Sequence, residues 1–483
     1  MDWLQAPDYW LTRLVIERAL GGIYGVAFLV AAMQFRPLLG ERGLLPAARF
    51  LRHVRFLDAP SIFHAHYSDT ALLVLAWSGV VLSVAVVAGL VDLAPVWLSI
   101  LVWFALWALY QSIVNVGQVF YGFGWETLLL EAGFLTIFLG SGPSVPAWPL
   151  ILLYRWLVFR VEFGAGMIKL RGDRCWRDLT CLYYHHETQP MPNPFSWFFH
   201  HLPKPLHRVE VLGNFFAQLV VPFLLFTPQP VASIAGAIIV FTQGWLVLSG
   251  NFSWLNFMTM TIAFSAFDDH TLSLVLNVHK PGLVPLPVWW QGLVVAVTLL
   301  VVVLSYRPAR NLVSRRQLMN FSFDPFHLVN TYGAFGSVTK ERYEIVVEGT
   351  SDPDLGEPGW QEYEFKGKPG DPRKVPRQFA PYHLRLDWLM WFAAMDSVFR
   401  HQWFIAFVHR LLEADRPTLK LLRFDPFGGK APAAVRATLY LYHFSTWREL
   451  RSDHVWWDRT LTGEYLPPVV LDSAGELARL RRG

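Results

Sequence analysis

Cysteine and charge are both scarce in this sequence. Only two of its 483 residues are cysteine, which excludes a disulfide framework and allows at most one bridge. Charged side chains make up 16% of the residues, whereas hydrophobic side chains make up 53% and aromatic ones 16%. Soluble domains carry about 25% charged residues, so the composition excludes an ordinary soluble protein. It is typical of a chain whose surface partly meets lipid.

Three further absences narrow the class of protein. The start, MDWLQAPDYW, has neither a basic segment nor a small-residue cleavage site, so we expect the first membrane helix to act as the targeting signal. Without an internal repeat or a pair of broken apolar helices, a transporter is disfavoured. The net charge of +4 could suggest nucleic acid. The basic residues flank apolar runs instead of forming one patch, however, so the expected partner is the membrane lipid and not nucleic acid.

Apolar runs of membrane-spanning length fill residues 1–306. Because one crossing needs about 20 apolar residues, they predict eight or nine transmembrane helices. The run at 252–267 is short and contains Asn256, which predicts a tilted or re-entrant segment. The runs are 13–35, 70–91, 96–120, 124–140, 147–168, 210–227, 230–249, 252–267 and 287–305.

Two polar loops interrupt these runs, at 36–68 and at 169–209. In the first, LLPAARFLRHVRF has apolar residues at helical spacing opposite basic ones, which predicts an amphipathic helix on the membrane surface. With nine crossings, both loops and the C-terminal tail fall on one side. All three are rich in arginine, so the positive-inside rule assigns that side to the cytoplasm.

The apolar runs end at a basic juxtamembrane linker, 307–319, and residues 320–483 predict a separate extramembrane domain. Three segments have strand-like content: RYEIVVEGT, WQEYEFKG and ATLYLYHF. LRLDWLMWFAAMDSVFRHQWFIAFVHRLLE predicts one or two amphipathic helices whose aromatic side chains pack in the core. The predicted fold is therefore an α-helical polytopic membrane protein with a C-terminal mixed α/β domain that contains a β-sheet.

Several ionisable side chains lie within or at the ends of the apolar runs. Charge in a bilayer is costly and persists only where it is paired or used. In the structural interpretation, Glu126 or Glu131 faces the bundle and pairs with Arg155, Arg160 or Lys169. In the alternative, a group of five residues lines a cavity that lipid or quinone reaches and transfers protons there, with Lys169 as a base. The simpler role for Lys169 is snorkelling to the headgroups. These candidate catalytic residues are Lys169, Glu126, Glu131, Arg160 and Glu162.

The loop after Lys169 holds most of the other candidate residues. Cys175 and Cys181 match neither a redox nor a metal spacing, and we expect a disulfide only if this side is oxidising. Adjacent histidines such as His185 and His186 do not match zinc-site spacing, so no metal is predicted. The residues predicted to bind a client protein or a ligand are Arg155, Arg171, Trp176, His185, His186, Glu187, Gln189, Pro190 and Asn193.

Three segments, GWETLLLEAGFL, FRVEFGAGMIKLRGDRCWRDLTCLYYHHETQPMPNPFSWFFHHLP and NTYGAFGSVTKERYEIVVEGT, resemble the lipase maturation factor family, and the resemblance covers nearly the whole chain. It implies a polytopic membrane protein that helps secreted dimeric lipases to fold, with the loop and the C-terminal domain in the lumen of the endoplasmic reticulum. We follow the resemblance here, against the arginine count. The membrane part is more distantly similar to vitamin K-dependent carboxylases, but no motif aligns their catalytic lysine with Lys169.

The sequence therefore predicts a membrane-embedded folding factor for exported proteins, with lipases as clients by resemblance. Exposed Trp, Phe and Pro residues of the loop and the tail would contact the client. The alternative is a membrane enzyme acting on a lipid or quinone-like substrate. No cofactor is predicted, although a lipid or quinone could occupy a cavity, and the oligomeric state is left open. The lean loops suggest a bacterial member in the cell membrane; a eukaryotic member would lie in the endoplasmic reticulum.

Overall fold

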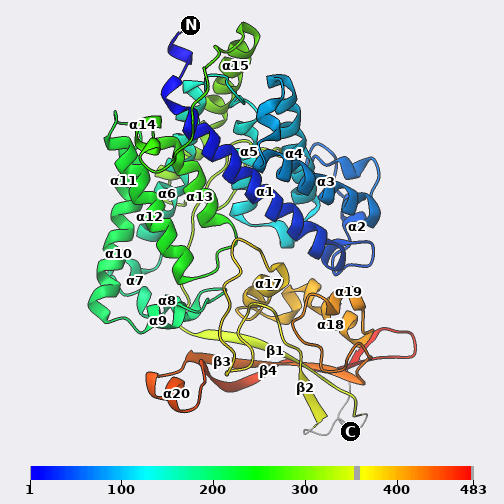
Figure 1. Cartoon of the computed structure of the whole chain (residues 1–483). Helices are drawn as coiled ribbons and strands as arrows, with labels where there is room; N and C mark the ends of the chain where they lie inside the picture. Colours follow the sequence, from blue (N-terminus) through cyan, green and yellow to red (C-terminus); the bar gives the residue numbers. More distant parts are fainter. Residues whose placement is uncertain (1, 353–358, 480–483) are drawn as a thin grey trace.

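The chain folds into a helical region and a C-terminal region built on a sheet (Figure 1). The computed structural model describes residues 2–352 and 359–479. The N-terminus lies at the end of the helical region that is remote from the sheet (Figure 1). The start of the chain and the sheet therefore lie at opposite ends of the molecule.

Five helices in the described part of the chain are long and apolar enough to cross a membrane. They span Pro7–Leu39, Asp69–Val87, Val96–Val116, Val231–Ser249 and Val288–Val313. The first contains α1 (Trp10–Leu39), the next three are α3, α4 and α12, and the last joins α15 (Val288–Leu304) to α16 (Tyr306–Val313). This confirms a multi-pass membrane protein.

The remaining predicted crossings are shorter or more polar than the sequence suggested. Helix α5 (Gly124–Thr136) has only 13 residues, and α13 (Leu255–Ala263) has 9. Helix α6 (Trp148–Arg171) is 24 residues long but carries buried charges. The predicted total of eight or nine is therefore not confirmed. The other helices of this region are α2 (Ala47–Leu51), α7 (Arg174–Arg177), α8 (Leu182–Thr188), α9 (Ser196–His200), α10 (Lys204–Leu219), α11 (Val221–Leu224) and α14 (Asp269–Ser273).

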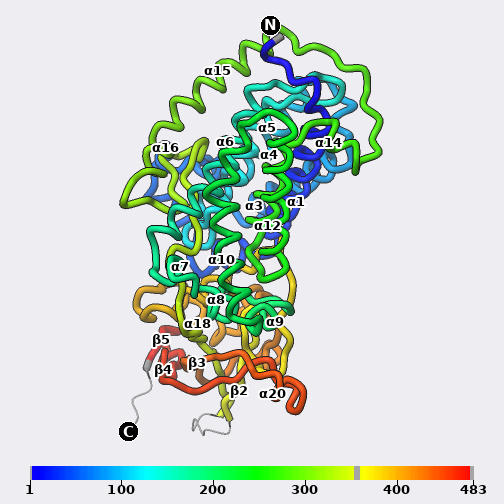
Figure 2. Tube along the Cα trace, turned by 90° about the vertical axis from the view of Figure 1, so that its left-hand side faces the viewer, coloured from blue at the N-terminus to red at the C-terminus, as the bar shows by residue number. Residues whose placement is uncertain are grey.

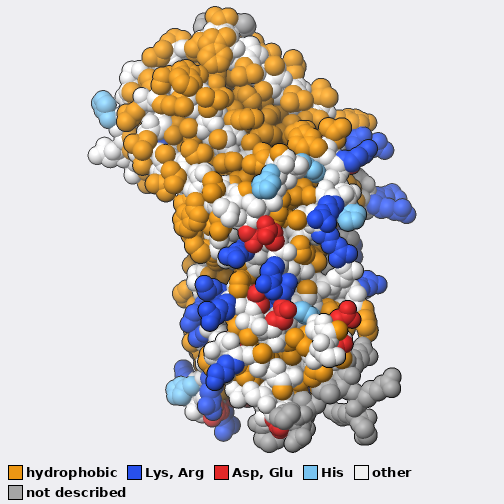
Figure 3. All heavy atoms as spheres, turned by 90° about the vertical axis from the view of Figure 1, so that its right-hand side faces the viewer, with side chains coloured by type: hydrophobic (Ala, Val, Ile, Leu, Met, Phe, Trp, Pro, Cys, Tyr) orange, Lys and Arg blue, Asp and Glu red, His pale blue; other side chains and the backbone are white. Residues whose placement is uncertain are grey.

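The surface supports the membrane assignment. In the view of Figure 3, hydrophobic side chains cover most of the helical region, and charged side chains gather toward the sheet. Val81 on α3 and Val303 on α15 are 66% and 71% exposed. A soluble protein rarely exposes so large an apolar surface, so this part of the molecule lies in lipid.

The amphipathic helix predicted within loop 36–68 is shorter than expected. Of the predicted stretch 44–56, only Ala47–Leu51 is α-helical, beginning directly after Pro46, which lacks a backbone N–H and suits a helix start. Arg49, Arg52 and Arg55 are nevertheless exposed, as the basic face requires. The segment is a compact loop with one short helix.

The C-terminal region is a five-stranded antiparallel sheet with the strand order β2-β1-β3-β4-β5. Its helices α17, α18 and α19 lie between the strands and the membrane helices (Figure 1). The strands are β1 (Arg342–Thr350), β2 (Trp360–Glu362), β3 (Ala434–Phe444), β4 (Trp457–Leu471) and β5 (Leu477–Arg479), and the helices are α17 (Arg385–Ala393), α18 (Gln402–Leu412), α19 (Arg416–Leu419) and α20 (Trp447–Ser452).

Each of the three predicted strand segments contains a strand, although WQEYEFKG does so only over Trp360–Glu362. The segment predicted to form one or two helices forms α17 and α18, and Trp388, Trp403 and Phe404 are buried as expected. Strand β4 was missed. It contains Gly463 and the pair Pro467–Pro468, residues that normally interrupt strands. The pairing of β3 with β4 shifts register near Ala437, and this irregularity accommodates the two prolines.

The central loop 169–209 contacts the sheet. Figure 1 and Figure 2 both place α8 and α9 beside the strands. Trp197 of α9 packs in a buried cluster with Tyr442 and Phe444 of β3 and Trp457 of β4, and its Nε1 donates to the carbonyl of Ser445 at 2.9 Å. The loop and the tail therefore contact each other; that both lie on one side of the membrane stays a prediction.

Candidate functional site

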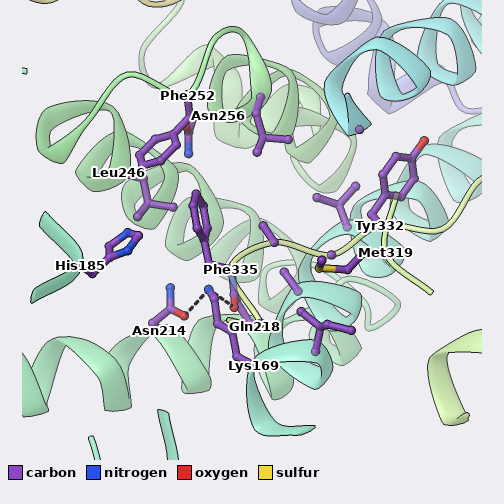
Figure 4. A pocket seen from close by; sticks show the side chains of 18 of the residues that line it. Lys169, His185, Asn214, Gln218, Leu246, Phe252, Asn256, Met319, Tyr332 and Phe335 are labelled. Carbon is purple, nitrogen blue, oxygen red and sulfur yellow. Dashed lines mark hydrogen bonds between the residues drawn. The ribbon is translucent and has the colours of Figure 1, made fainter. Parts of the chain in front are cut away.

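A cavity of about 1350 Å³ lies where the membrane helices meet the central loop. Its walls come from α6, α8, α10, α12 and α13, closed by the segment 315–337 and by α17. Figure 4 shows the side chains of Lys169, His185, Asn214 and Phe335 around this space. The cavity thus joins the membrane region, the central loop and the C-terminal region.

Lys169 is the cationic centre of the cavity wall. Only 5% of the residue is exposed, and its Nζ donates to Asn214 Oδ1 and Gln218 Oε1 at 2.9 Å each (Figure 4). The Trp176 ring lies 5.1 Å from the same nitrogen. Lys169 therefore turns inward, and the snorkelling interpretation is wrong. Because an ammonium has three N–H donors, one remains for a molecule in the cavity.

Glu162 lies two turns before Lys169 on the same face of α6 and begins a line of polar side chains. Its Oε1 accepts from Gln243 Nε2 at 2.7 Å, and Gln243 Oε1 accepts from Asn256 Nδ2 at 2.7 Å. All three side chains are buried and line the cavity. Side-chain amides thus form hydrogen bonds with both Lys169 and Glu162. The two charged groups lie in the same largely apolar cavity and do not contact each other directly.

The rest of the wall is largely apolar, with Phe252, Met319 and Phe335 among its members (Figure 4). Several of the lining side chains on α10 and α12 are also exposed, so the cavity opens between these two helices. They are Leu206, Val209, Phe216, Phe241 and Trp245. An apolar space with a cation and a few amides at one end suits an amphiphilic molecule.

The other three candidate catalytic residues, Glu126, Glu131 and Arg160, are not among the residues that line the cavity. Glu131 and Arg160 form a fully buried ion pair. Glu131 Oε2 also accepts from the Tyr332 hydroxyl at 2.7 Å and from Asn330 N at 3.0 Å. An ion pair of this kind was predicted, and it holds α5, α6 and the segment around 330 together.

Glu126 has a partner that the sequence did not suggest. Its Oε1 accepts from Arg385 Nη1 of α17 at 2.7 Å, and both side chains are fully buried. The Tyr110 hydroxyl donates to the other oxygen. His383 lies 3.9 Å away, and burial lowers its pKa to about 4. The neutral imidazole therefore leaves Arg385 as the charge partner of Glu126.

The residues predicted to contact a client fall into two groups. Trp176, His185, His186, Pro190 and Arg171 line the cavity. The others hold the fold: Glu187 Oε2 accepts from Phe444 N at 2.6 Å, Gln189 Nε2 donates to the Ser249 carbonyl at 2.8 Å, and Asn193 Nδ2 donates to Gln378 Oε1 at 2.8 Å. These three side chains are buried. That they contact a client stays a prediction.

Arg155 lies away from the loop and binds backbone. Its guanidinium donates to the carbonyls of Ser265 at 3.0 Å and Leu225 at 2.9 Å, and to the Tyr9 hydroxyl at 3.0 Å. Only 2% of the residue is exposed. The predicted ion pair with a glutamate is wrong for Arg155, because these neutral acceptors satisfy it.

Cys175 and Cys181 form a disulfide. Cys181 packs with Leu182 and Val211, and Cys175 packs at the edge of the same cluster. The bond therefore closes the short segment before α8 and holds the start of α8 against α10.

An exposed aromatic cluster lies where the central loop meets the sheet. It consists of Phe195, Phe198 and Trp447, which are 53%, 42% and 47% exposed. The rings of Phe198 on α9 and Trp447 on α20 lie 5.9 Å apart. The sequence predicted exposed aromatic residues on this face but not these three. Only the fold brings residues 195–198 next to residue 447.

Two family models match the chain. Residues 11–274 match the model described as "Lipase maturation factor transmembrane domain", and residues 328–467 match "Lipase maturation factor C-terminal domain". A human protein named lipase maturation factor 1 is 42% identical, with the alignment covering 97% of this chain and 89% of that protein. The mouse protein of the same name is 40% identical, covering 99% and 90%.

A human protein named lipase maturation factor 2 is less similar, at 29% identity over 95% of this chain and 83% of its own length. No solved structure matches the chain. These relatives come from animals. The expectation of a bacterial source, drawn from the lean loops, therefore has no support.

Proposed function

This chain belongs to the lipase maturation factor family, and we propose that it is a membrane-embedded factor that helps exported lipases to fold. The observation that supports a client-binding site is the exposed aromatic cluster on the face shared by the central loop and the sheet. Partly folded chains expose apolar side chains, and aromatic residues are the most effective contacts for them. The enzyme hypothesis is not favoured, because the relatives are named as maturation factors.

Replacing Phe198 and Trp447 together with serine is expected to lower the yield of active secreted lipase about tenfold or more, since aromatic anchors each contribute about 2 kcal/mol at protein interfaces. Both side chains are exposed, but their rings lie 5.2 and 4.5 Å from the ring of buried Trp197. A loss of stability of about 1–3 kcal/mol is therefore expected, and lipase yields are compared at equal amounts of folded protein. The measurement is lipase activity in the medium of cells that depend on this chain for maturation.

Phe399→Ser is the matched control, because Phe399 is 78% exposed but belongs to the turn before α18 instead of α9 or α20. It should leave lipase yield unchanged. A normal yield from the double variant at equal expression would move the client site elsewhere and remove this proposal.

We also propose that the central loop and the C-terminal region face an oxidising compartment, the lumen of the endoplasmic reticulum in a eukaryotic cell. The disulfide between Cys175 and Cys181 supports this side, since such bonds persist outside reducing compartments. It argues against the cytoplasmic side that the arginine count favours.

The positions of the first described residues and of the sheet support an odd number of crossings. The N-terminus and the sheet lie at opposite ends of the molecule (Figure 1). This arrangement needs an odd number of crossings, so of the predicted eight or nine we propose nine. The proposed division is 1–306 for the membrane domain, 307–319 for the linker and 320–483 for the extramembrane domain. The two family matches support it, because they end and begin on either side of the linker.

The cavity is proposed to hold a membrane lipid with an anionic headgroup. Lys169 supplies the charge inside it, Arg171, Arg315 and Arg316 line it as well, and the opening between α10 and α12 faces the bilayer. A bound lipid would brace the helices that carry the central loop.

Lys169→Met is expected to reduce the anionic lipid that copurifies with the chain from about one molecule to a small fraction, because methionine fills a similar volume without the charge. Native mass spectrometry of the detergent-purified protein measures this ratio. Lys280→Met is the control, since Lys280 binds Asp269 at 2.7 Å and does not line the cavity. Equal lipid retention by both variants would refute the assignment.

A further inference from the structure

Two histidines and a glutamate meet at the end of the cavity nearest the sheet. His186 lies on α8, and His207 and Glu210 lie on α10. His186 Nε2 is 3.8 Å and His207 Nδ1 is 3.9 Å from Glu210 Oε2, and the three ligand atoms all lie within 4.8 Å of one another. His207 and Glu210 are three residues apart, which places both on one face of a helix. We refer to these residues as the His–Glu cluster.

The facing atoms of the His–Glu cluster have no hydrogen-bond partner within the described ranges 2–352 and 359–479. These atoms are both ring nitrogens of His186, Nδ1 of His207 and Oε2 of Glu210. His186 is 2% exposed and His207 is 1% exposed. Buried polar atoms are rarely left without a partner, because each one costs about 1–3 kcal/mol. Three converging residues with open acceptors therefore need a common partner.

The outer atoms of Glu210 and His207 are held by other groups. Glu210 Oε1 accepts from Trp245 Nε1 at 2.8 Å, and His207 Nε2 lies 3.3 Å from the His200 carbonyl. An N–H at His207 Nε2 leaves Nδ1 with its lone pair directed at the cluster. A metal-binding histidine is typically fixed in this way by a carbonyl behind it.

We propose that His186, His207 and Glu210 bind a divalent transition-metal ion, zinc by the chemistry of the donors. Two imidazole nitrogens and one carboxylate oxygen are a common zinc donor set with bonds of about 2.0–2.2 Å. The observed separations between donors are somewhat longer than they would be around a bound zinc ion. A movement of a few tenths of an ångström by the side chains closes the site.

The position of the site gives the metal a structural role. It links α8, which carries the central loop, to α10, which forms one side of the cavity opening. The disulfide already fixes the start of α8 against α10 through Cys181 and Val211, and the metal fixes its other end. His186 and Glu210 also line the cavity, so a fourth ligand can reach the ion from there. This inference is independent of the lipase assignment.

The test uses the full chain in detergent, stripped with a chelator and dialysed against Zn²⁺. Elemental analysis is expected to find about one zinc per chain, with a higher thermal unfolding temperature than the stripped protein. Glu210→Gln and His207→Asn should each weaken zinc binding by about tenfold or more. His201→Asn is the matched control: His201 lies in the same loop, its Nδ1 contacts the Trp197 carbonyl at 2.8 Å, and it lies outside the cluster.

X-ray absorption of the zinc-loaded, unsubstituted chain keeps the proposal testable if the variants misfold. It should show only nitrogen and oxygen neighbours, including imidazole. Sulfur neighbours would place the zinc on reduced Cys175 and Cys181 and overturn the proposal. It would equally fail if the unsubstituted chain retained no zinc, or if Glu210→Gln and His201→Asn bound it equally well. In that case the cluster does not bind a metal ion.

Discussion

Replacing Arg385 with methionine is expected to destabilise the folded chain by about 3–5 kcal/mol, because Glu126 is left as an unpaired charge in the interior. Both residues are fully buried, and the bond between them is 2.7 Å long. The same Arg385 nitrogen donates to the Phe120 carbonyl at 2.6 Å, and the guanidinium carbon lies 3.4 Å from the centre of the Tyr121 ring. The substitution removes all of these contacts at once.

The Arg385→Met substitution should also separate the helical region from the C-terminal region. Arg385 begins α17, and its backbone N–H donates to Gln34 Oε1 of α1 at 3.0 Å. Gln34 Nε2 in turn donates to the His383 carbonyl at 2.7 Å. The C-terminal region thus docks on α1 and α5 through polar contacts around this charge pair and through aromatic packing, in which the Trp388 ring lies 4.9 Å from that of Trp125. Loss of the charge pair is expected to abolish lipase maturation together with stability.

Thermal unfolding followed by tryptophan fluorescence measures the change, with Arg400→Met as control. Arg400 pairs with Asp396 at 3.6 Å, but its side chain is 77% exposed, and exposed pairs contribute about 0–1 kcal/mol. Combining Arg385→Met with Glu126→Leu should recover part of the loss, because no charge is then left unpaired. If Arg385→Met unfolds at the same temperature as Arg400→Met, the charge pair does not hold the regions together.

The two glutamates of α5 show how far the sequence could be interpreted. Glu131 and Arg160 lie in neighbouring apolar runs, so the cost of burying each charge predicted their pairing. Glu126 pairs with a residue 259 positions away. Arg385 lies in a segment that the sequence assigned to a separate domain. Only the docking of that domain reveals the pair, and no local pattern encodes it.

The lining of the cavity and the His–Glu cluster could not be predicted from the sequence for a different reason. Lys169 was recognised as unusual, but its burial depends on Asn214 and Gln218 of α10, which carry no sequence signal of their own. The adjacent histidine pairs in the sequence do not match the spacing of a zinc site. The spacing of His207 and Glu210 on one helix face was visible in the sequence, whereas His186 joins them only because α8 folds back onto α10.

Arg342→Met is expected to lower the free energy of unfolding by about 3 kcal/mol or more and to release the central loop, because each buried carbonyl that loses its hydrogen-bond donor costs about 1–3 kcal/mol. Its guanidinium donates to the carbonyls of Glu187 at 3.0 Å and Pro190 at 3.1 Å, and also to that of Gln189. It pairs at 2.5 Å with Glu344, two residues on and on the same face of β1. Without it, three buried carbonyls lose their donor.

Hydrogen exchange distinguishes a released loop from a general loss of stability. The amides of α8 and α9 should exchange faster in Arg342→Met under conditions where α1 and α3 stay protected. Arg459→Met is the control on the same sheet: it pairs with Glu362 at 2.6 Å, but both side chains are 23–29% exposed. Lys368 remains 2.9 Å from Glu344 in the variant, so the sheet itself keeps a charge partner. Equal exchange in both variants would mean that Gln189 and Asn193 hold the loop without Arg342.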